Sequence, residues 1–130
     1  MSFDRMRKAL AFIEDHLSEP IKLKDIADAA ALSPFHFARA FKKASGITPM
    51  RYVLLCRVDA SKKLLANDDT QHATIVYECG FASESHFCTA FKSVTGMTTT
   101  AWRKLTTKTT AAIAVTASVF DASLLMAACP

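Results

Sequence analysis

Apolar residues recur at intervals of three and four along most of this 130-residue chain, which is the spacing of one face of an α-helix. The segment 4–17 shows the pattern first, with Met6, Leu10, Ile13 and Leu17 on one face and charged residues elsewhere. Up to residue 105, no segment alternates apolar and polar residues as a half-exposed strand would. The pattern therefore predicts an all-α fold.

Residues that begin and end helices divide this part of the chain into seven predicted helices. Ser33 and Thr48 can each accept a hydrogen bond from free backbone N–H groups of a first turn, and each is followed by a proline. Gly46 and Gly96 suit the left-handed conformation that often ends a helix. The predicted helices cover residues 4–17, 23–30, 33–45, 48–66, 71–79, 83–95 and 99–105.

The segment 33–48 recurs fifty residues later as 83–98, with Ser, His, Phe, Ala, Phe, Lys, Gly and Thr in equal places. Repeats of this length usually indicate one supersecondary unit used twice. Each copy follows a short helix and a tight turn, which is the helix-turn-helix arrangement. We therefore expect two helix-turn-helix subdomains, at about 23–45 and 71–95, joined by a long linker helix at about 48–66.

The turns of the two predicted units differ slightly. Ala31 and Leu32 make the first turn, and Gly80, Phe81 and Ala82 make the second. If Gly80 is matched to Ala31, the second turn is one residue longer than the first.

The two faces of the repeated helix differ in how closely their residues match between the two copies. The apolar face is the same in both copies: Phe37 with Phe87, Ala40 with Ala90, Phe41 with Phe91. On the opposite face Lys42 matches Lys92, but the other positions differ: Phe35, Ala38 and Arg39 against Ser85, Cys88 and Thr89. A duplicated core with unlike outer faces suits an asymmetric target, and drift on an idle surface is the alternative.

Positive charge is concentrated on and just after the first copy. The chain has a net charge of +4, but residues 33–65 alone hold seven basic residues and one acidic residue, a net of +6. The basic side chains of the linker helix, Arg51, Arg57, Lys62 and Lys63, are expected to lie mostly off its apolar stripe. Such clustering suits a polyanionic partner, and a solvated helix face is the alternative.

The sequence gives little support for disulfides, metal binding or catalysis. The four cysteines form no CxxC pair, and no signal peptide is recognisable, so disulfides are not expected; Cys56 and Cys79 are predicted to be small buried apolar residues. His36 and His86 occur once per copy, which makes a metal site unlikely to form, and partly exposed residues without a role are favoured. No nucleophile elbow or phosphate loop occurs. We expect neither an enzyme nor a cofactor.

The tail, residues 106–130, is apolar, rich in Ala and Thr, and without a clean period. A docked helix or strand, the start of a second domain, and a vector-derived or frame-shifted end all fit better than a membrane span, because Thr116, Ser118 and Asp121 interrupt its middle. Its structure stays open at this point.

Two stretches resemble the two helix-turn-helix units of the AraC/XylS family of bacterial transcription regulators. The first comprises Leu23-Lys24-Asp25-Ile26-Ala27, Leu32-Ser33-Pro34, Phe37, Phe41-Lys42, Gly46-Ile47-Thr48-Pro49 and Tyr52. The second comprises Ile75-Val76-Tyr77-Glu78-Cys79-Gly80-Phe81-Ala82-Ser83, Ser85-His86-Phe87, Phe91-Lys92 and Gly96-Met97-Thr98. The resemblance covers about residues 5–105, so the DNA-binding domain is expected at 1–105.

Several positions depart from the family pattern. Thr99 stands where the family usually has proline, and His72 where it usually has an apolar residue. Ala31 occupies a turn position often held by glycine, and Thr89 a position that often carries arginine. Trp102 with its neighbours replaces the usual Tyr-Arg ending.

The resemblance implies that the two recognition helices enter successive major-groove segments of double-stranded DNA, about 34 Å apart. Arg39 is then the best base-contacting candidate, because an arginine can bind guanine O6 and N7 together. The other base-contacting candidates are Phe35, Ala38, Ser83, Glu84, Ser85, Cys88 and Thr89. The phosphate-binding candidates are Ser33, Lys42, Lys43, Arg51, Arg57, Lys92 and Arg103.

The expected function is a cytoplasmic, nucleoid-associated regulator that binds a specific DNA site as a monomer, without membrane contact. The resemblance further implies activation of transcription through RNA polymerase. Two alternatives stay open: a helical protein–protein interaction module, and a fragment of a larger ligand-responsive regulator.

Overall fold

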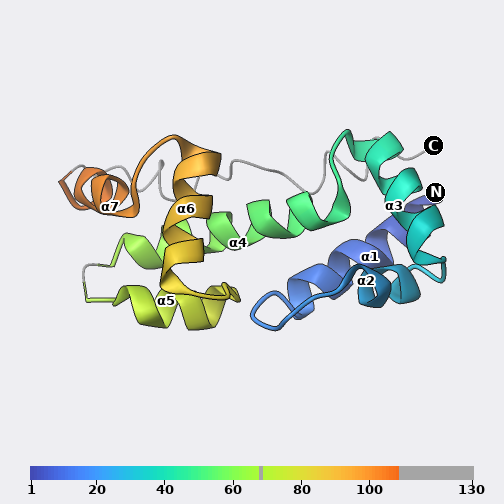
Figure 1. The fold of residues 1–130 in the computed structure, drawn as a ribbon, viewed down its shortest axis with the longest axis horizontal. Helices are drawn as coiled ribbons and strands as arrows, with labels where there is room; N and C mark the ends of the chain where they lie inside the picture. The colour runs from blue at the N-terminus through green and yellow to red at the C-terminus, as the bar shows by residue number, and fades with distance from the viewer. Residues whose placement is uncertain (68, 109–130) are drawn as a thin grey trace. The chain divides into compact units, whose positions relative to one another are not determined.

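The computed structural model describes residues 1–67 and 69–108, and this part of the chain consists of α-helices and connecting segments without strands (Figure 1). The seven helices are α1 (Phe3–Asp15), α2 (Leu23–Ala29), α3 (Pro34–Ser45), α4 (Pro49–Leu65), α5 (His72–Cys79), α6 (Glu84–Thr95) and α7 (Thr99–Lys108). The prediction of an all-α fold with seven helices is confirmed. Helix α7 continues past its predicted end at Leu105, and the tail from residue 109 onwards lies outside the described residues.

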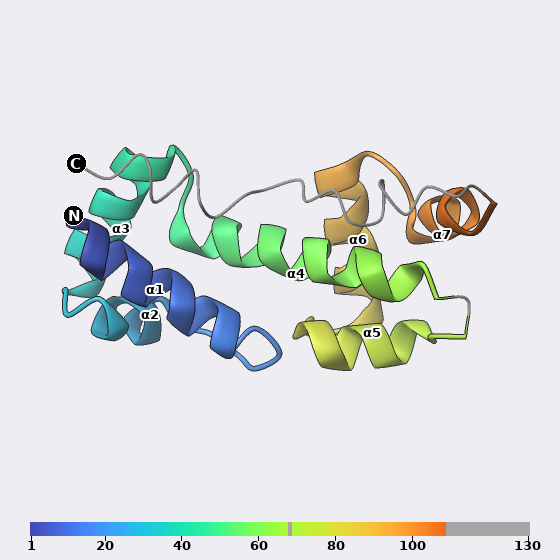
Figure 2. The same ribbon diagram turned by 180° about the vertical axis from the view of Figure 1, so that it is seen from behind.

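The chain forms two compact units that divide within α4, between Val53 and Leu54. The first unit contains α1 to α3 and the first turn of α4, and the second contains the rest of α4 with α5 to α7. In the first unit α1 and α2 lie side by side, and in the second α6 crosses α5 (Figure 2). Helix α4 is therefore not a free-standing linker, because its residues Val58 and Leu65 belong to the core of the second unit.

Each unit is built around two phenylalanines of the repeated helix. Phe37 and Phe41 are fully buried, with ring centroids 5.6 Å apart, and the ring of Tyr52 lies 5.8 Å from that of Phe41. In the second unit Phe87 and Phe91 are equally buried, with centroids 6.0 Å apart. Trp102 lies 5.7 Å from Phe91, in the place of Tyr52. The predicted inward face is thus confirmed in both copies.

The same hydroxyl contacts begin the repeated helix in both units. The Oγ atoms of Ser33 and Ser83 accept hydrogen bonds from the N–H groups of His36 and His86, at 3.2 and 3.0 Å. These bonds satisfy donors that the first turn of a helix leaves free. The predicted N-cap Ser33 is therefore confirmed, as is Thr48, whose Oγ1 accepts from the N–H of Arg51 at 3.2 Å.

The ends of the repeated helices also match. Gly46 and Gly96 adopt left-handed conformations, with φ of 84° and 79°. Just before them, the hydroxyl groups of Ser45 and Thr95 each donate to a carbonyl of the preceding turn at 2.8 Å. The duplication thus includes the polar ends of the helix as well as its apolar face.

The turn that precedes the repeated helix differs by one residue. Ala31 and Gly80 both have positive φ, 58° and 78°, and in both cases the following N–H bonds to a carbonyl five residues back. Since Ser33 follows Ala31 by two residues and Ser83 follows Gly80 by three, the predicted longer second turn is confirmed. A left-handed conformation costs alanine about 1 kcal/mol, which glycine avoids.

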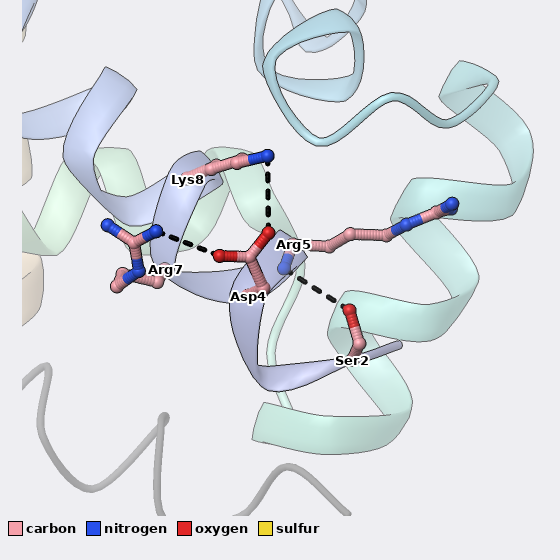
Figure 3. A network of polar contacts seen from close by, with 5 residues as sticks. All are labelled: Ser2, Asp4, Arg5, Arg7 and Lys8. Atoms are coloured by element: carbon pink, nitrogen blue, oxygen red, sulfur yellow. Dashed lines mark hydrogen bonds and ion pairs between the residues drawn. The ribbon is translucent and has the colours of Figure 1, made fainter.

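Helix α1 begins with a small polar network on the surface (Figure 3). Asp4 accepts a hydrogen bond from Arg7 at 2.8 Å and pairs with Lys8 at 3.2 Å, while Ser2 Oγ accepts from the N–H of Arg5 at 3.3 Å. The hydrogen bonds from Arg7 and Lys8 lower the pKa of the Asp4 carboxyl below its ordinary value. The network also places a negative charge at the positive end of the α1 dipole.

One basic residue of α4 does not lie where the pattern predicts. The side chain of Lys62 is only 1% exposed, with Nζ 3.6 Å from Asp59 Oδ1 and 5.3 Å from the ring centroid of Trp102. Lys62 is therefore an exception to the prediction that the basic residues of this helix lie mostly outside its apolar stripe. Because this charge is paired and covered by an indole ring, a count of basic residues overstates the charge that an external partner would meet.

Two departures from the family pattern contact each other. His72 Nε2 lies 2.9 Å from Thr99 Oγ1, and Thr99 is only 4% exposed. By the repeat, Thr99 corresponds to the buried Pro49, and by the match of Gly80 to Ala31, His72 corresponds to Leu23. An apolar pair of positions in the first unit is therefore a hydrogen-bonded pair in the second.

We predict that these two substitutions depend on each other. His72→Leu should lower the free energy of unfolding by about 1–3 kcal/mol, because it leaves the buried Thr99 hydroxyl with only the weak 4.0 Å contact to the Cys88 sulfur. The double variant with Thr99→Pro should lose less than the two single variants together, because proline suits the first position of α7. Urea unfolding of the four proteins measures the coupling; strictly additive losses would contradict it.

Candidate nucleic-acid interface

The outer face of α3 presents an aromatic ring and an arginine together. Phe35 is 72% exposed, although large apolar side chains are usually covered. The guanidinium carbon of Arg39, which is also exposed, lies 5.5 Å from the centroid of the Phe35 ring. The two residues are one helical turn apart, on the side opposite the buried Phe37 and Phe41. Two of the predicted base-contacting residues are thus brought together on the surface.

The remaining candidates of the first unit surround this pair to different degrees. Lys42 and Lys43 are exposed in the last turn of α3, where positive charge also interacts well with the helix dipole. Arg51 is exposed in the first turn of α4. Ala38 is half-buried, and Ser33 is exposed but accepts the capping hydrogen bond from His36.

The outer face of α6 carries smaller side chains. Glu84, Ser85 and Thr89 are exposed, as is Lys92. Cys88 is half-buried, and its sulfur lies 4.0 Å from Thr99 Oγ1, so it faces the start of α7 more than solvent. Ser83, like Ser33, is exposed and caps its helix.

Two arginines of the second unit are less exposed than the sequence suggests. Arg57 is half-buried, and burial lowers the pKa of its guanidinium, although arginine stays charged at neutral pH. Arg103 donates from Nε to the carbonyl of Leu65 at 3.0 Å and from one terminal nitrogen, Nη2, to the carbonyls of both Asn67 and Thr70. It thereby satisfies the end of α4, and its phosphate contact stays a prediction.

The cysteines of the described segments are free thiols. Cys79 is 2% exposed, and burial raises the pKa of its thiol to about 11, so it is neutral and packs as an apolar residue, as predicted. Cys56 is half-buried. Among the described residues, no three His, Cys, Asp or Glu side chains come together to hold a metal ion.

Sequence reasoning missed two contacts of the candidate site. The approach of Arg39 to Phe35 has a local signal, an aromatic residue four positions before an arginine on an exposed helix face. The carbonyl contacts of Arg103 have none, because its partners lie 33 to 38 residues earlier in the chain.

The pattern of duplicated helix-turn-helix units agrees with comparisons to known proteins. The sequence profile of a family described as "Helix-turn-helix domain" matches residues 26–105. The regulatory protein PocR of Salmonella typhimurium is 36% identical over 100 residues, which cover 77% of this chain and 33% of PocR. The chain belongs to the AraC/XylS family of transcription regulators.

A second regulator has a similar sequence identity to this chain. The transcriptional activator RhaS of Citrobacter koseri is 36% identical over 88 residues, which cover 68% of this chain and 32% of RhaS. The chain thus spans about a third of the length of these curated relatives. The relatives are regulators by name, in agreement with the prediction that the chain is a DNA-binding regulator and not an enzyme.

Solved structures of the family have the same fold. An AraC-type transcriptional regulator from Chromobacterium violaceum aligns with a TM-score of 0.73 and 26% identity, over 79% of this chain and 92% of that one. The DNA-binding domain of AdpA, solved in complex with a target DNA, aligns with a TM-score of 0.71 and 25% identity, over 77% of this chain and 90% of that one.

Within the described residues, no helix is long and apolar enough to span a membrane.

The two possible roles of Arg103, binding backbone carbonyls or binding phosphate, predict different effects when it is substituted. We expect Arg103→Ala to lower the free energy of unfolding by about 2 kcal/mol, because three carbonyl groups lose a charged donor. Arg103→Lys should be nearly as unstable, because a single ammonium cannot span those carbonyls. Thermal unfolding and the salt dependence of DNA affinity are measured for both. A stable Arg103→Lys protein, with Arg103→Ala reducing only the salt dependence, would indicate phosphate binding instead.

Proposed function

We propose that this regulator binds an asymmetric double-stranded DNA site through α3 and α6, which enter successive major-groove segments, and that it activates transcription. The observation that carries this proposal is the contrast between the cores and the outer faces of the two units. The buried phenylalanines are the same in both, whereas the exposed residues differ: Phe35 and Arg39 against Ser85 and Thr89. Two unlike surfaces on one chain suit an asymmetric site without dimerisation.

The first unit supplies the stronger base contacts in this proposal. Arg39 binds guanine O6 and N7, and Phe35 contacts a neighbouring thymine methyl group. Lys42, Lys43 and Arg51, which are exposed in the same unit, bind phosphates and fix the position of α3 on the duplex.

The second unit supplies weaker contacts. Ser85 and Thr89 can bond to several bases, and Glu84 accepts a hydrogen bond only from a donor such as cytosine N4. Lys92 is the phosphate-binding residue of α6, and Ser83 and Ser33 add hydroxyl donors at the helix N-termini. Cys88 and Ala38 are half-buried and contribute shape more than hydrogen bonds.

Relatives support the remaining parts of the proposal. The AdpA domain was solved with a target DNA, and RhaS is named as an activator. The proposal further includes what the family resemblance implies: action in the bacterial cytoplasm, at the nucleoid, as a monomer on DNA that contacts RNA polymerase.

Selection from random DNA duplexes tests the proposal directly. We expect an enriched sequence without two-fold symmetry, bound by one protein copy, with an affinity that falls steeply as salt rises, because Lys and Arg displace counterions from phosphates. Mass measurement of the complex gives the stoichiometry. A palindromic site bound by two copies would contradict the asymmetric mode, and absence of any enriched sequence would contradict specific binding.

Arg39 and Lys42 should affect this binding in different ways. Arg39→Ala should cost about 1–3 kcal/mol and relax preference at one base pair, because it removes a contact to a base edge. Lys42→Ala, its matched control on the same helix, should weaken all sequences alike and reduce the salt slope by about 1. Binding titrations on single-base variants of the selected site separate the two. Identical effects of both substitutions would refute the assignment of Arg39 as a base-contacting residue.

A further inference from the structure

The contact between Phe35 and Arg39 has a property that matters for DNA recognition. The guanidinium carbon lies 5.5 Å from the ring centroid, within the distance at which a cation is attracted to the face of an aromatic ring. This attraction uses the positive charge of the group and none of its N–H donors. The five N–H donors of the guanidinium, which lie in its plane, thus remain available for a base edge.

Among the described residues, no ion-pair partner competes with Phe35 for Arg39. An exposed arginine has many rotamers, and ordering them opposes binding. The contact with the ring of Phe35 therefore restricts where this guanidinium lies before DNA arrives.

The second unit offers an internal comparison. The positions of Phe35 and Arg39 are occupied there by Ser85 and Thr89, so the ring and the guanidinium are both absent. The buried residue between these two positions is a phenylalanine in both copies, Phe37 in α3 and Phe87 in α6. The aromatic residue and the arginine thus occur together in one copy and are absent together from the other.

We propose that Phe35 is a positioning residue for Arg39: its ring holds the guanidinium on the outer face of α3 and thereby strengthens the preference for guanine at the base pair that Arg39 contacts. The inference rests on the proposed DNA contact of Arg39. It assigns Phe35 a role in specificity at a base pair that Phe35 itself does not touch.

Substitutions of Phe35 test this role. Phe35→Leu keeps an apolar side chain for a thymine methyl but removes the ring face, so guanine preference at the Arg39 base pair should fall about two- to fivefold, the size expected for an exposed cation–π contact. Phe35→Trp keeps a ring face and should retain the preference. Because Phe35 is exposed, both variants should fold, which circular dichroism checks. The salt slope of binding should not change in either.

The Arg39→Ala background separates this inference from the proposed function. If Phe35 acts through Arg39, adding Phe35→Leu to Arg39→Ala should cause no further loss of guanine preference. A preference that is lost in Arg39→Ala but kept in Phe35→Leu overturns only the role of Phe35. A preference that survives Arg39→Ala overturns both the role of Phe35 and the assignment of Arg39.

A transfer experiment gives a second test, in which specificity is gained. Thr89→Arg alone should add general DNA affinity with little base preference. Ser85→Phe with Thr89→Arg should add a guanine preference at one base pair of the second segment, because the pair of α3 is then recreated on α6. Selection from random duplexes compares the two proteins. Equal preference in the single and the double variant would overturn the positioning role.

Discussion

Burial of two phenylalanines one turn apart decides how each recognition helix is oriented. Phe37 and Phe41, like Phe87 and Phe91, are completely covered, and full burial of each ring contributes about 1.5–3 kcal/mol. A helix with two such residues has only one rotation about its axis that buries both. The residues on the opposite side, Arg39 in one unit and Thr89 in the other, are exposed as a consequence. The surface that we propose to contact DNA is therefore set by apolar packing on the far side of the same helix.

Features that depend on neighbours in the sequence could be predicted, and those that depend on distant residues could not. Helical periodicity, the caps Ser33 and Thr48, and the longer second turn all involve residues within about one turn of each other. The burial of Lys62 depends on Trp102, forty residues later, which covers it. The same holds for Arg103, whose carbonyl partners belong to the end of α4 and the segment after it. The exposed side chains of α3 were predictable as a set, but not the contact between Phe35 and Arg39.

The pair of His72 and Thr99 shows how departures from a family pattern should be interpreted. Each alone would place a polar group where the first unit has an apolar residue, Leu23 or Pro49. Together they form a hydrogen bond beside the ring of Phe87, whose centroid lies 5.7 Å from that of His72. The second unit therefore contains a polar connection between α5 and the start of α7 where the first has apolar side chains. Substitutions that look unfavourable singly can be neutral as a set.

The additional residue in the second turn, Ala82, has left the following helix unaltered. Counting from Ser33 and from Ser83, the next four positions have the same exposure in both units, and the ends of the two helices match residue by residue. The capping serine, and not the length of the preceding turn, thus determines where the helix begins. An insertion at this joint is absorbed before it reaches the core. Such tolerance allows the two units of one chain to differ in the length of this turn while the helix that follows keeps the same start, core and end.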